Sequence, residues 1–315
     1  MVFEHKGGLR RSSRRLIGDQ SAAAGHRDVG VGTDSPTRYA SQMLVIVRPP
    51  GAAFRDAISN HPDHRHIDVS RAQAQHTAFS AALEDAGLPL LRLPEESDLP
   101  DATFVSDALV ALAPAPAFRG GAPMVVVARP ALPSRRLEVE SVLRAALGRL
   151  PADTQVVRVE EPGTLEGGDV VIYGDRIAIG LSGRTNGIGA QILADAARSL
   201  GHRPFLCPVA DRLHLATAVT AVAPGALIGT VAGFASLDAA GPNAAPPDEI
   251  RRFLLPDDEL LGANVLALAA HAFLASGSPS AARLLREAGL VVHELELDQF
   301  ALADGGPTCL VNILP

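Results

Sequence analysis

The sequence predicts an α/β fold built from a repeated helix–strand unit, and two observations support this prediction. Stretches of Ala and Leu at helical spacing end four times at a glycine and continue into a short extended run. Two β-branched runs also share one design, in which Met opens the run and Arg-Pro ends it. Units of about 50 to 60 residues favour a repeat architecture. A doubly wound sheet would give a similar pattern, so the residues alone leave both open.

The two β-branched runs are "MLVIVRPP" (43–50) and "MVVVARPA" (124–131). Val and Ile favour strands, and the proline that follows has no amide hydrogen with which to continue one. We therefore predict a buried strand in each run. Arg48 and Arg129 occupy the same place in the two copies.

The four helix–glycine–strand units end their helices at Gly87, Gly148, Gly201 and Gly289. Each glycine suits the left-handed position that follows a helix. The longest gap between units contains "DDELLGANVLALAAHAF", which is apolar enough for another helix or strand. The Ala/Pro/Gly-rich stretch 237–249 predicts a surface loop rather than a domain boundary.

The beginning of the chain differs in charge from the rest. Residues 1–42 hold seven Lys/Arg and four Asp/Glu, a net of +3, which leaves −10 for residues 43–315 out of the total of −7. The segment has no apolar core of a secretory signal, although its Arg and Ser content resembles a transit peptide. We predict that residues 1–42 form a disordered extension, or result from a start upstream of Met43, and that residues 43–315 form a single domain.

Charge and composition also restrict the partners. An acidic body argues against nucleic acid as the main partner and is compatible with a cationic small substrate. Two cysteines cannot build a disulfide framework, so we expect a reducing compartment and a cytoplasmic location. No apolar run reaches the roughly 18 residues of a membrane span. The sequence leaves the choice between a monomer and a homodimer open.

Residues 163–191 contain the first candidate site. In "LEGGDV", Glu166 stands before two glycines that permit a sharp turn or a close approach of the backbone, although an ordinary acidic turn would look the same. Glycines 180, 183, 187 and 189 suggest a phosphate loop but match neither nucleotide-binding spacing. Arg184, at a strand-to-helix turn, suits the capture of a carboxylate.

Three further residues carry possible chemistry. Asp107 is predicted within an apolar strand, where a carboxylate needs a partner, a cation or solvent. His214 lies between two leucines and is also predicted in a strand, where it is either a core residue or a general acid and base. Cys309 follows "DGGPT", so it is either a packing thiol or a nucleophile on a turn.

Taken together, one cysteine, one histidine and two carboxylates form a set typical of nucleophilic catalysis. Carboxylates beside the thiol would raise its pKa unless a bound cation neutralised them. The set therefore indicates a positively charged substrate. No Cys-x-x-Cys or His-Glu-x-x-His spacing is present, and we expect neither metal nor cofactor.

These residues lie in stretches that resemble the dimethylarginine dimethylaminohydrolase family, within the pentein superfamily that includes the arginine deiminases. The likeness extends from about Met43 to Pro315. It is carried in order by "DVSRAQAQH", "LPDATFVSD", "ARPALPSRR", "LEGGDV", "GLSGRTN", "PVADRLHL", "LLPDDELLGAN" and "DGGPTCL". The resemblance implies a five-bladed αβ propeller of ββαβ modules with pseudo-five-fold symmetry, and a hydrolase acting on C–N bonds of linear amidines.

The resemblance also implies roles for individual residues. Cys309 is expected to be the nucleophile, His214 the general acid and base, and Glu166 its carboxylate partner, with Asp107 as a second carboxylate for the guanidinium. The other expected substrate contacts are the amino-acid-end residues Asp101, Arg129 and Arg184, the backbone near Ala303, and a lid contact near Phe54.

The implied reaction is covalent. The Cys309 thiolate would attack the guanidinium carbon of a methylated arginine, and a thiouronium intermediate would then be hydrolysed to citrulline. The strand-like tail after Cys309 is expected to belong to the last unit. The chain has Ser106 where the family often has Glu, which removes one negative charge and leaves the identity of the guanidino substrate open.

Three alternatives accompany this prediction. The first is a deiminase or hydrolase that acts on another guanidino compound, such as arginine. The second is a nucleotide-binding α/β protein that uses the glycines of residues 180–189. The third is a binding protein of the same fold without catalytic activity.

Overall fold

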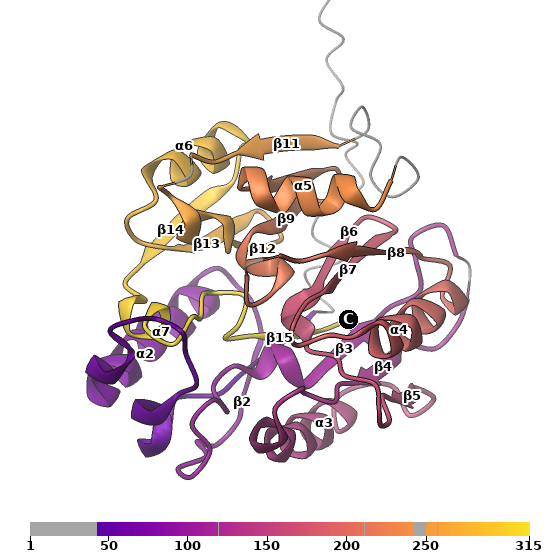
Figure 1. Cartoon of the computed structure of the whole chain (residues 1–315), viewed down its shortest axis with the longest axis horizontal. Coiled ribbons are helices and arrows are strands. Elements are labelled where there is room, and N and C mark those ends of the chain that lie inside the picture. The colour runs from indigo at the N-terminus through magenta and orange to yellow at the C-terminus, as the bar shows by residue number, and fades with distance from the viewer. Residues whose placement is uncertain (1–42, 119, 211, 242–249, 257) are drawn as a thin grey trace, which may run out of the picture. The chain divides into compact units, whose positions relative to one another are not determined.

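The computed structural model describes residues 43–118, 120–210, 212–241, 250–256 and 258–315 (Figure 1). These residues belong to one compact unit. The predicted extension, residues 1–42, lies outside them. Of the predicted loop 237–249, residues 237–239 are the end of helix α5 (Val231–Ala239), so this part of the prediction is wrong, and residues 242–249 lie outside the described residues.

The β-structure of the described residues consists of five sheets with three strands each. This confirms the α/β class and excludes one doubly wound sheet. In order, the sheets contain β15 (Asn312–Leu314), β1 (Leu44–Val47) and β2 (Leu90–Arg92); β3 (Leu109–Leu112), β4 (Met124–Val127) and β5 (Gln155–Arg158); β6 (Val170–Tyr173), β7 (Arg176–Leu181) and β8 (Arg203–Pro208); β9 (Val219–Ala223), β10 (Ala226–Gly229) and β11 (Arg251–Leu254); β12 (Leu266–Leu268), β13 (His271–Ala275) and β14 (Val291–Leu295).

Every sheet has the same pairing pattern. The central strand pairs antiparallel with the first strand and parallel with the third, and an α-helix lies between the central strand and the third in each case. The connecting helices are α2 (Val69–Asp85), α3 (Val139–Leu147), α4 (Gly187–Ser199), α5 and α6 (Pro279–Glu287). Parallel neighbours need such a crossover, which explains the helix between each pair.

The tail after Cys309 completes the first sheet rather than the last one. Strand β15 pairs antiparallel with β1, with Leu44 opposite Leu314 and Ile46 opposite Asn312. The expectation of a strand is confirmed, but its predicted place is wrong. Main-chain hydrogen bonds thus join the C-terminal turn that carries Cys309 to the first strand of the described chain.

The glycine pattern is confirmed in three of the four predicted units. Gly87, Gly201 and Gly289 have positive φ after their helices. Gly148 does not, because its φ of −69° continues the right-handed backbone. The sequence pattern missed helix α5, which is followed by Gly241 with φ of 92°.

The central strands provide much of the core. All four residues of β4 are buried, as are the last three of β1 and the first five of β7. Burial on both faces favours continuous apolar runs, which is why the two Met-led runs were recognisable. Side chains cap α2, α4 and α5, since Asp68, Asn186 and Thr230 accept hydrogen bonds from main-chain amides three residues on.

Contacts between sheets follow the order of the chain. Strand β15 contacts β3, helix α4 contacts β4, β6 contacts β9, and β9 contacts β12. Helix α2 of the first sheet contacts β14 of the fifth. Each sheet therefore contacts the next, and the fifth contacts the first.

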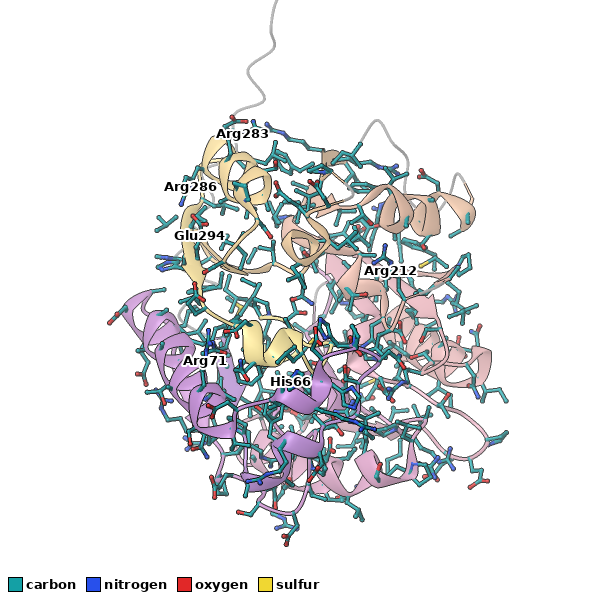
Figure 2. The ribbon with its side chains drawn as sticks, turned by 60° about the vertical axis from the view of Figure 1, so that its left-hand side comes forward. His66, Arg71, Arg212, Arg283, Arg286 and Glu294 are labelled. Carbon is teal, nitrogen blue, oxygen red and sulfur yellow. The ribbon has the colours of Figure 1, made fainter. Side chains whose placement is uncertain are left out.

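Ion pairs connect surface elements on one flank. Arg286 on α6 bonds Glu294 on β14 at 2.7 Å, and Arg71 on α2 bonds Asp298 on α7 (Asp298–Ala301) at 2.8 Å (Figure 2). Such exposed pairs contribute about 0–1 kcal/mol each. Among the described helices, none combines the length and apolarity that a bilayer span requires.

Candidate active site

The candidate site is built from the turns that precede the first strand of each sheet. Short 3₁₀ helices η3 (Val105–Ala108), η5 (Gly167–Asp169), η6 (Leu215–Thr217) and η8 (Leu260–Ala263) come before β3, β6, β9 and β12, and the Cys309 turn comes before β15. Contacts join η3 to η5, η5 to η6, and η6 to η8. Side chains far apart in the sequence therefore gather at one end of these strands.

Two residues lie in these turns instead of in strands. Asp107 belongs to η3, and His214 is the residue before η6. The prediction of a strand at both positions is wrong by a few residues. The difference matters, because a turn directs the side chain toward the neighbouring turns, whereas a strand residue would point into a sheet face.

A small inner chamber lies among these turns, with a free volume of about 20 Å³. Its lining includes Asp101, Asp107, Arg184, His214, Ala303 and Cys309. An outer cleft of about 640 Å³ shares Arg184, Leu213 and Asp304 with the chamber. Arg212, which is labelled in Figure 2, also lines this cleft. The cleft therefore borders the chamber directly.

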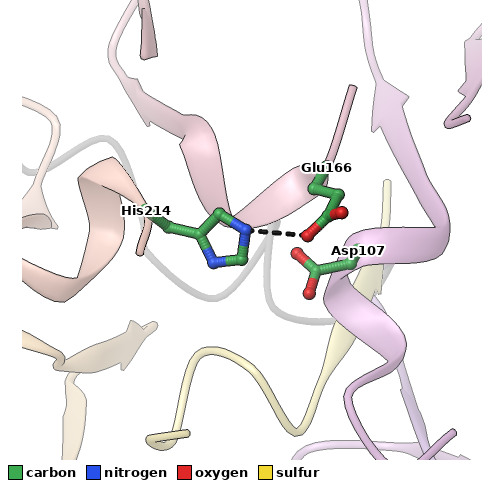
Figure 3. A group of neighbouring side chains, drawn as sticks. All are labelled: Asp107, Glu166 and His214. Carbon is green, nitrogen blue, oxygen red and sulfur yellow. Dashed lines mark hydrogen bonds and ion pairs between the residues drawn. The ribbon is translucent and has the colours of Figure 1, made fainter. Parts of the chain in front are cut away.

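Glu166, His214 and Asp107 face one another inside the chamber wall (Figure 3). His214 Nε2 lies 2.9 Å from Glu166 Oε2. Glu166 Oε1 also accepts a hydrogen bond from the Ala131 amide at 3.2 Å, and Asp107 Oδ1 accepts one from the Gly168 amide at 2.8 Å. These contacts fix the direction of both carboxylates.

The charges in this cluster shift each other's titration. Burial opposes the charged form of His214, but Asp107 and Glu166 prevail and raise its pKa to about 9. Burial also opposes the ionised form of Asp107, yet His214 and Arg135 hold its pKa below the usual value. The histidine is thus protonated at neutral pH in the free protein.

Cys309 is 8% exposed and lies in the same chamber. Burial, followed by the charge of Asp107, raises the pKa of its thiol to about 11. Asn264 Oδ1 accepts hydrogen bonds from the amide and the hydroxyl of Thr308, both at 3.0 Å. Asn264 therefore fixes the turn beside Cys309, and its position before β12 matches that of the other site residues.

The glycines of "LEGGDV" and "DGGPTC" allow close packing. A Cβ on Gly168 would lie 2.5 Å from His214 Nδ1, and one on Gly305 would overlap the Phe104 ring. Neither glycine is among those with positive φ; in the C-terminal turn that conformation falls on Asp304, at 56°. Glycine is needed here for space, not for a left-handed backbone.

Arg135, like Asn264, is a functional candidate that the sequence patterns missed. It is 5% exposed, and its Nη1 lies 2.9 Å from Asp107 Oδ2 and 3.5 Å from Glu166 Oε2. Its sequence, "PSRRLE", gives no sign of burial. The only signal is its place inside "ARPALPSRR", the stretch in which Arg129 is the predicted substrate contact.

Comparison with known proteins identifies the family. Two relatives are N(G),N(G)-dimethylarginine dimethylaminohydrolases. The protein from Streptomyces coelicolor is 35% identical over 266 residues, which cover 84% of this chain and 94% of the relative. That of Pseudomonas aeruginosa is 26% identical over 271 residues, covering 84% and 97%. This chain belongs to the dimethylarginine dimethylaminohydrolase family. No family model matches the sequence.

Solved structures agree with this family at the level of the fold. A dimethylarginine dimethylaminohydrolase from Pseudomonas aeruginosa in complex with citrulline has a TM-score of 0.73 and 24% identity, over 86% of this chain and 98% of that one. The N-terminal domain of ArgZ, an arginine dihydrolase, has a TM-score of 0.72 and 17% identity, over 87% and 98%.

Three of the other predicted substrate contacts line the inner chamber, namely Asp101, Arg184 and Ala303. Arg184 Nη1 lies 3.5 Å from Glu166 Oε1. Asp101 Oδ1 accepts a hydrogen bond from the Ile58 amide at 3.1 Å, and burial raises its pKa. Asp101 therefore holds the loop at Ile58 as well as facing the chamber.

Arg129 and Phe54 are not among the residues that line the chamber. Arg129 donates to Gly163 O at 3.1 Å and to Glu161 Oε2 at 2.8 Å, so its guanidinium joins two loops. Phe54 is fully buried against Phe300, with ring centroids 5.3 Å apart. Its place is in the core, beneath the turn that carries Ala303.

Ser106 and the glycine loop are also placed by the structure. Ser106 lines a separate, largely apolar cavity of about 820 Å³ and is not among the residues that line the inner chamber. In the glycine loop, Ser182 Oγ donates to Asp169, and Asn186 caps α4 through the Gly189 amide. These interactions tie the loop into the fold, and the family supports the hydrolase prediction over the nucleotide-binding alternative.

Asp107, Glu166 and His214 have potential ligand atoms within 4.8 Å of one another, a spacing that an ion would also accept. The Arg135 guanidinium already contacts both carboxylates. The cluster therefore has a cation of its own, and its chemistry matches a planar guanidinium better than a spherical metal ion.

Proposed function

We propose that this protein hydrolyses the guanidino group of methylated arginine, converting dimethylarginine to citrulline and dimethylamine. The single observation that carries the proposal is the convergence of Cys309, His214 and Asp107 on one chamber, with Glu166 bonded to His214. The names of the two relatives support the substrate class. We further propose that the five sheets form the blades of a propeller, which their sequential contacts support.

In this mechanism the carboxylates bind the substrate and the cysteine attacks it. Glu166 and Asp107 would hold the planar cation by charge-assisted hydrogen bonds. The cation offsets the negative charge that raises the pKa of Cys309 and so favours the thiolate. Sulfur then bonds to the guanidinium carbon.

His214 handles the protons of both steps. Its raised pKa leaves it protonated when the substrate binds, so it can donate a proton to the departing dimethylamine. The resulting S-alkylthiouronium is attacked by water, from which His214 takes a proton. The C–S bond breaks, citrulline leaves and the cysteine is restored.

Asp101 and Arg184 are proposed to receive the amino-acid end of the substrate. Both line the chamber, and Arg184 also lines the outer cleft through which a substrate would enter. Ala303 would contribute backbone groups in the same wall. Arg129 and Phe54 would act only indirectly, because their side chains make other contacts.

A substrate panel tests the proposal. Asymmetric dimethylarginine, monomethylarginine, arginine and agmatine should be compared by kcat/KM, with the released amine identified. Turnover should be fastest with a methylated arginine. Turnover of arginine with ammonia release, and none of dimethylarginine, would reassign the protein as an arginine deiminase or hydrolase.

A further inference from the structure

Glu138 is a buried carboxylate that the proposed mechanism does not use. It ends the 3₁₀ helix η4 (Pro133–Glu138), which also contains Arg135. Glu138 Oε2 accepts hydrogen bonds from Arg135 Nη2 at 3.1 Å and from Nε at 3.3 Å. Glu138 is only 6% exposed, and a buried carboxylate requires a partner of this kind.

The opposite edge of the same guanidinium reaches the inner chamber. Arg135 Nη1 bonds Asp107 at 2.9 Å and lies 3.5 Å from Glu166. Arg135 also lines the chamber together with Cys309 and His214. One arginine thus connects Glu138 to both carboxylates that are proposed to hold the substrate.

The charges around Arg135 are balanced only when a further cation is present. When ionised, Asp101, Asp107, Glu138 and Glu166 carry four negative charges, whereas Arg135, Arg184 and protonated His214 carry three positive ones. One guanidinium substrate would neutralise the difference. Without the charge of Glu138 the cluster would already be neutral, and the substrate would bring an uncompensated charge into a buried site.

We propose that Glu138 is a positioning residue for the reaction, which holds Arg135 in place and supplies the negative charge that lets a cationic substrate bind beside it. This rests on the proposed function only in requiring a cationic substrate. The free volume of about 20 Å³ means that the chamber must rearrange when the substrate enters. Glu138 keeps a partner for Arg135 while the substrate takes over Asp107 and Glu166.

The titration of Glu138 gives this role a pH dependence. Burial raises its pKa to about 7, against the opposing charge of Arg135. The other charged groups that face Glu138 are Asp101 and Asp107, which raise its pKa, and Arg48, whose own pKa is lowered by burial against the opposing charges of Glu96 and Glu138. The affinity for a cation should therefore fall as the pH drops through about 7.

Binding to an inactive background tests the proposal directly. In Cys309→Ser protein, Glu138→Gln should weaken the binding of asymmetric dimethylarginine roughly tenfold, since a buried charge acts over several ångströms. Citrulline, which has an uncharged side chain of similar length, should bind within about twofold of the parent affinity, because it brings no side-chain charge. The matched control is Glu140→Gln, two residues away, where an exposed glutamate pairs with Arg158.

Alkylation of Cys309 provides a test that does not depend on the identity of the substrate. With Cys309 intact, Glu138→Gln should slow the reaction with cationic chloroacetamidine roughly tenfold relative to neutral iodoacetamide, for the same electrostatic reason. Glu138→Asp, which keeps the charge, should restore most of this ratio. Equal losses for both reagents, or for dimethylarginine and citrulline, would indicate a merely structural role and overturn the proposal.

The wild-type protein supplies a measurement that needs no variant to fold. Its reactivity ratio of chloroacetamidine to iodoacetamide should fall as the pH drops below about 7. A ratio that does not change there would contradict the proposal even if Glu138→Gln cannot be prepared. Failure of the protein to act on dimethylarginine would remove the proposed function but leave both alkylation tests valid.

Discussion

The two cysteines of this protein are alike in burial and differ in their neighbours. Cys207 is fully buried in β8, where its thiol faces Ile179 O at 3.8 Å. Cys309 is 8% exposed in a turn and shares the inner chamber with His214 and Asp107. Burial is the main cause that raises both pKa values, to about 12 and about 11 respectively. The pKa values of the two thiols therefore hardly distinguish the cysteines. What distinguishes them is that Cys309 lines the chamber and has the proton donor His214 nearby.

The largest expected effect comes from exchanging each sulfur for oxygen. Cys309→Ser should lower kcat by at least about 10⁴-fold, because the hydroxyl is a far weaker nucleophile, while dimethylarginine still binds. Cys207→Ser should leave kcat within about twofold and only lower the melting temperature. Steady-state kinetics and calorimetric titration measure these outcomes. A similar loss of activity in both variants would erase the distinction between the two cysteines.

The second prediction separates the thiol pKa from catalysis. Asp107→Asn removes a charge that raises the pKa of Cys309, so this pKa should fall toward its ordinary value. Turnover should nevertheless drop about 100-fold, because the guanidinium loses a charged partner. The pH dependence of alkylation and kcat/KM measure the two effects. Asp195→Asn, at an exposed site on α4 paired with Arg198, is the control.

The third prediction concerns the effect of pH alone on the two thiols. Since the pKa of Cys309 is raised to about 11, its thiolate fraction and its labelling by iodoacetamide should rise continuously between pH 7 and 10. Cys207 should stay unlabelled in the folded protein over this range, because its side chain has no exposed surface. Peptide mass spectrometry after timed labelling reads both sites. Faster labelling of Cys207 than of Cys309 would reverse the comparison.

The smallest effect concerns the support of the Cys309 turn. Asn264→Ala removes the acceptor for the Thr308 amide and hydroxyl, so the sulfur should lose alignment. We expect a decrease in kcat of about fivefold to tenfold with little change in KM. A melting curve of the same variant separates this local effect from unfolding. An unchanged kcat would mean that the turn is held by its backbone alone.

The sequence determined the local chemistry and the repeated unit. The Met-led runs became β1 and β4, three of the four predicted helices end at a left-handed glycine, and the tail after Cys309 is a strand. These features depend on periodicity and on backbone conformation, which short segments encode. The family resemblance, carried by ordered motifs, is confirmed by the curated relatives.

Only the tertiary structure decided which polar residues meet. Asn264 and Arg135 were missed because their chemistry depends on partners about 45 and 28 residues away, Cys309 and Asp107. Arg129 and Phe54 fit the motifs but lie outside the chamber lining. The chamber arises where the turns before β3, β6, β9, β12 and β15 converge, and this convergence depends on how five sheets pack. A short segment of sequence supplies the polar residue in each turn. The packing of the sheets determines which other residues the side chain of that residue faces.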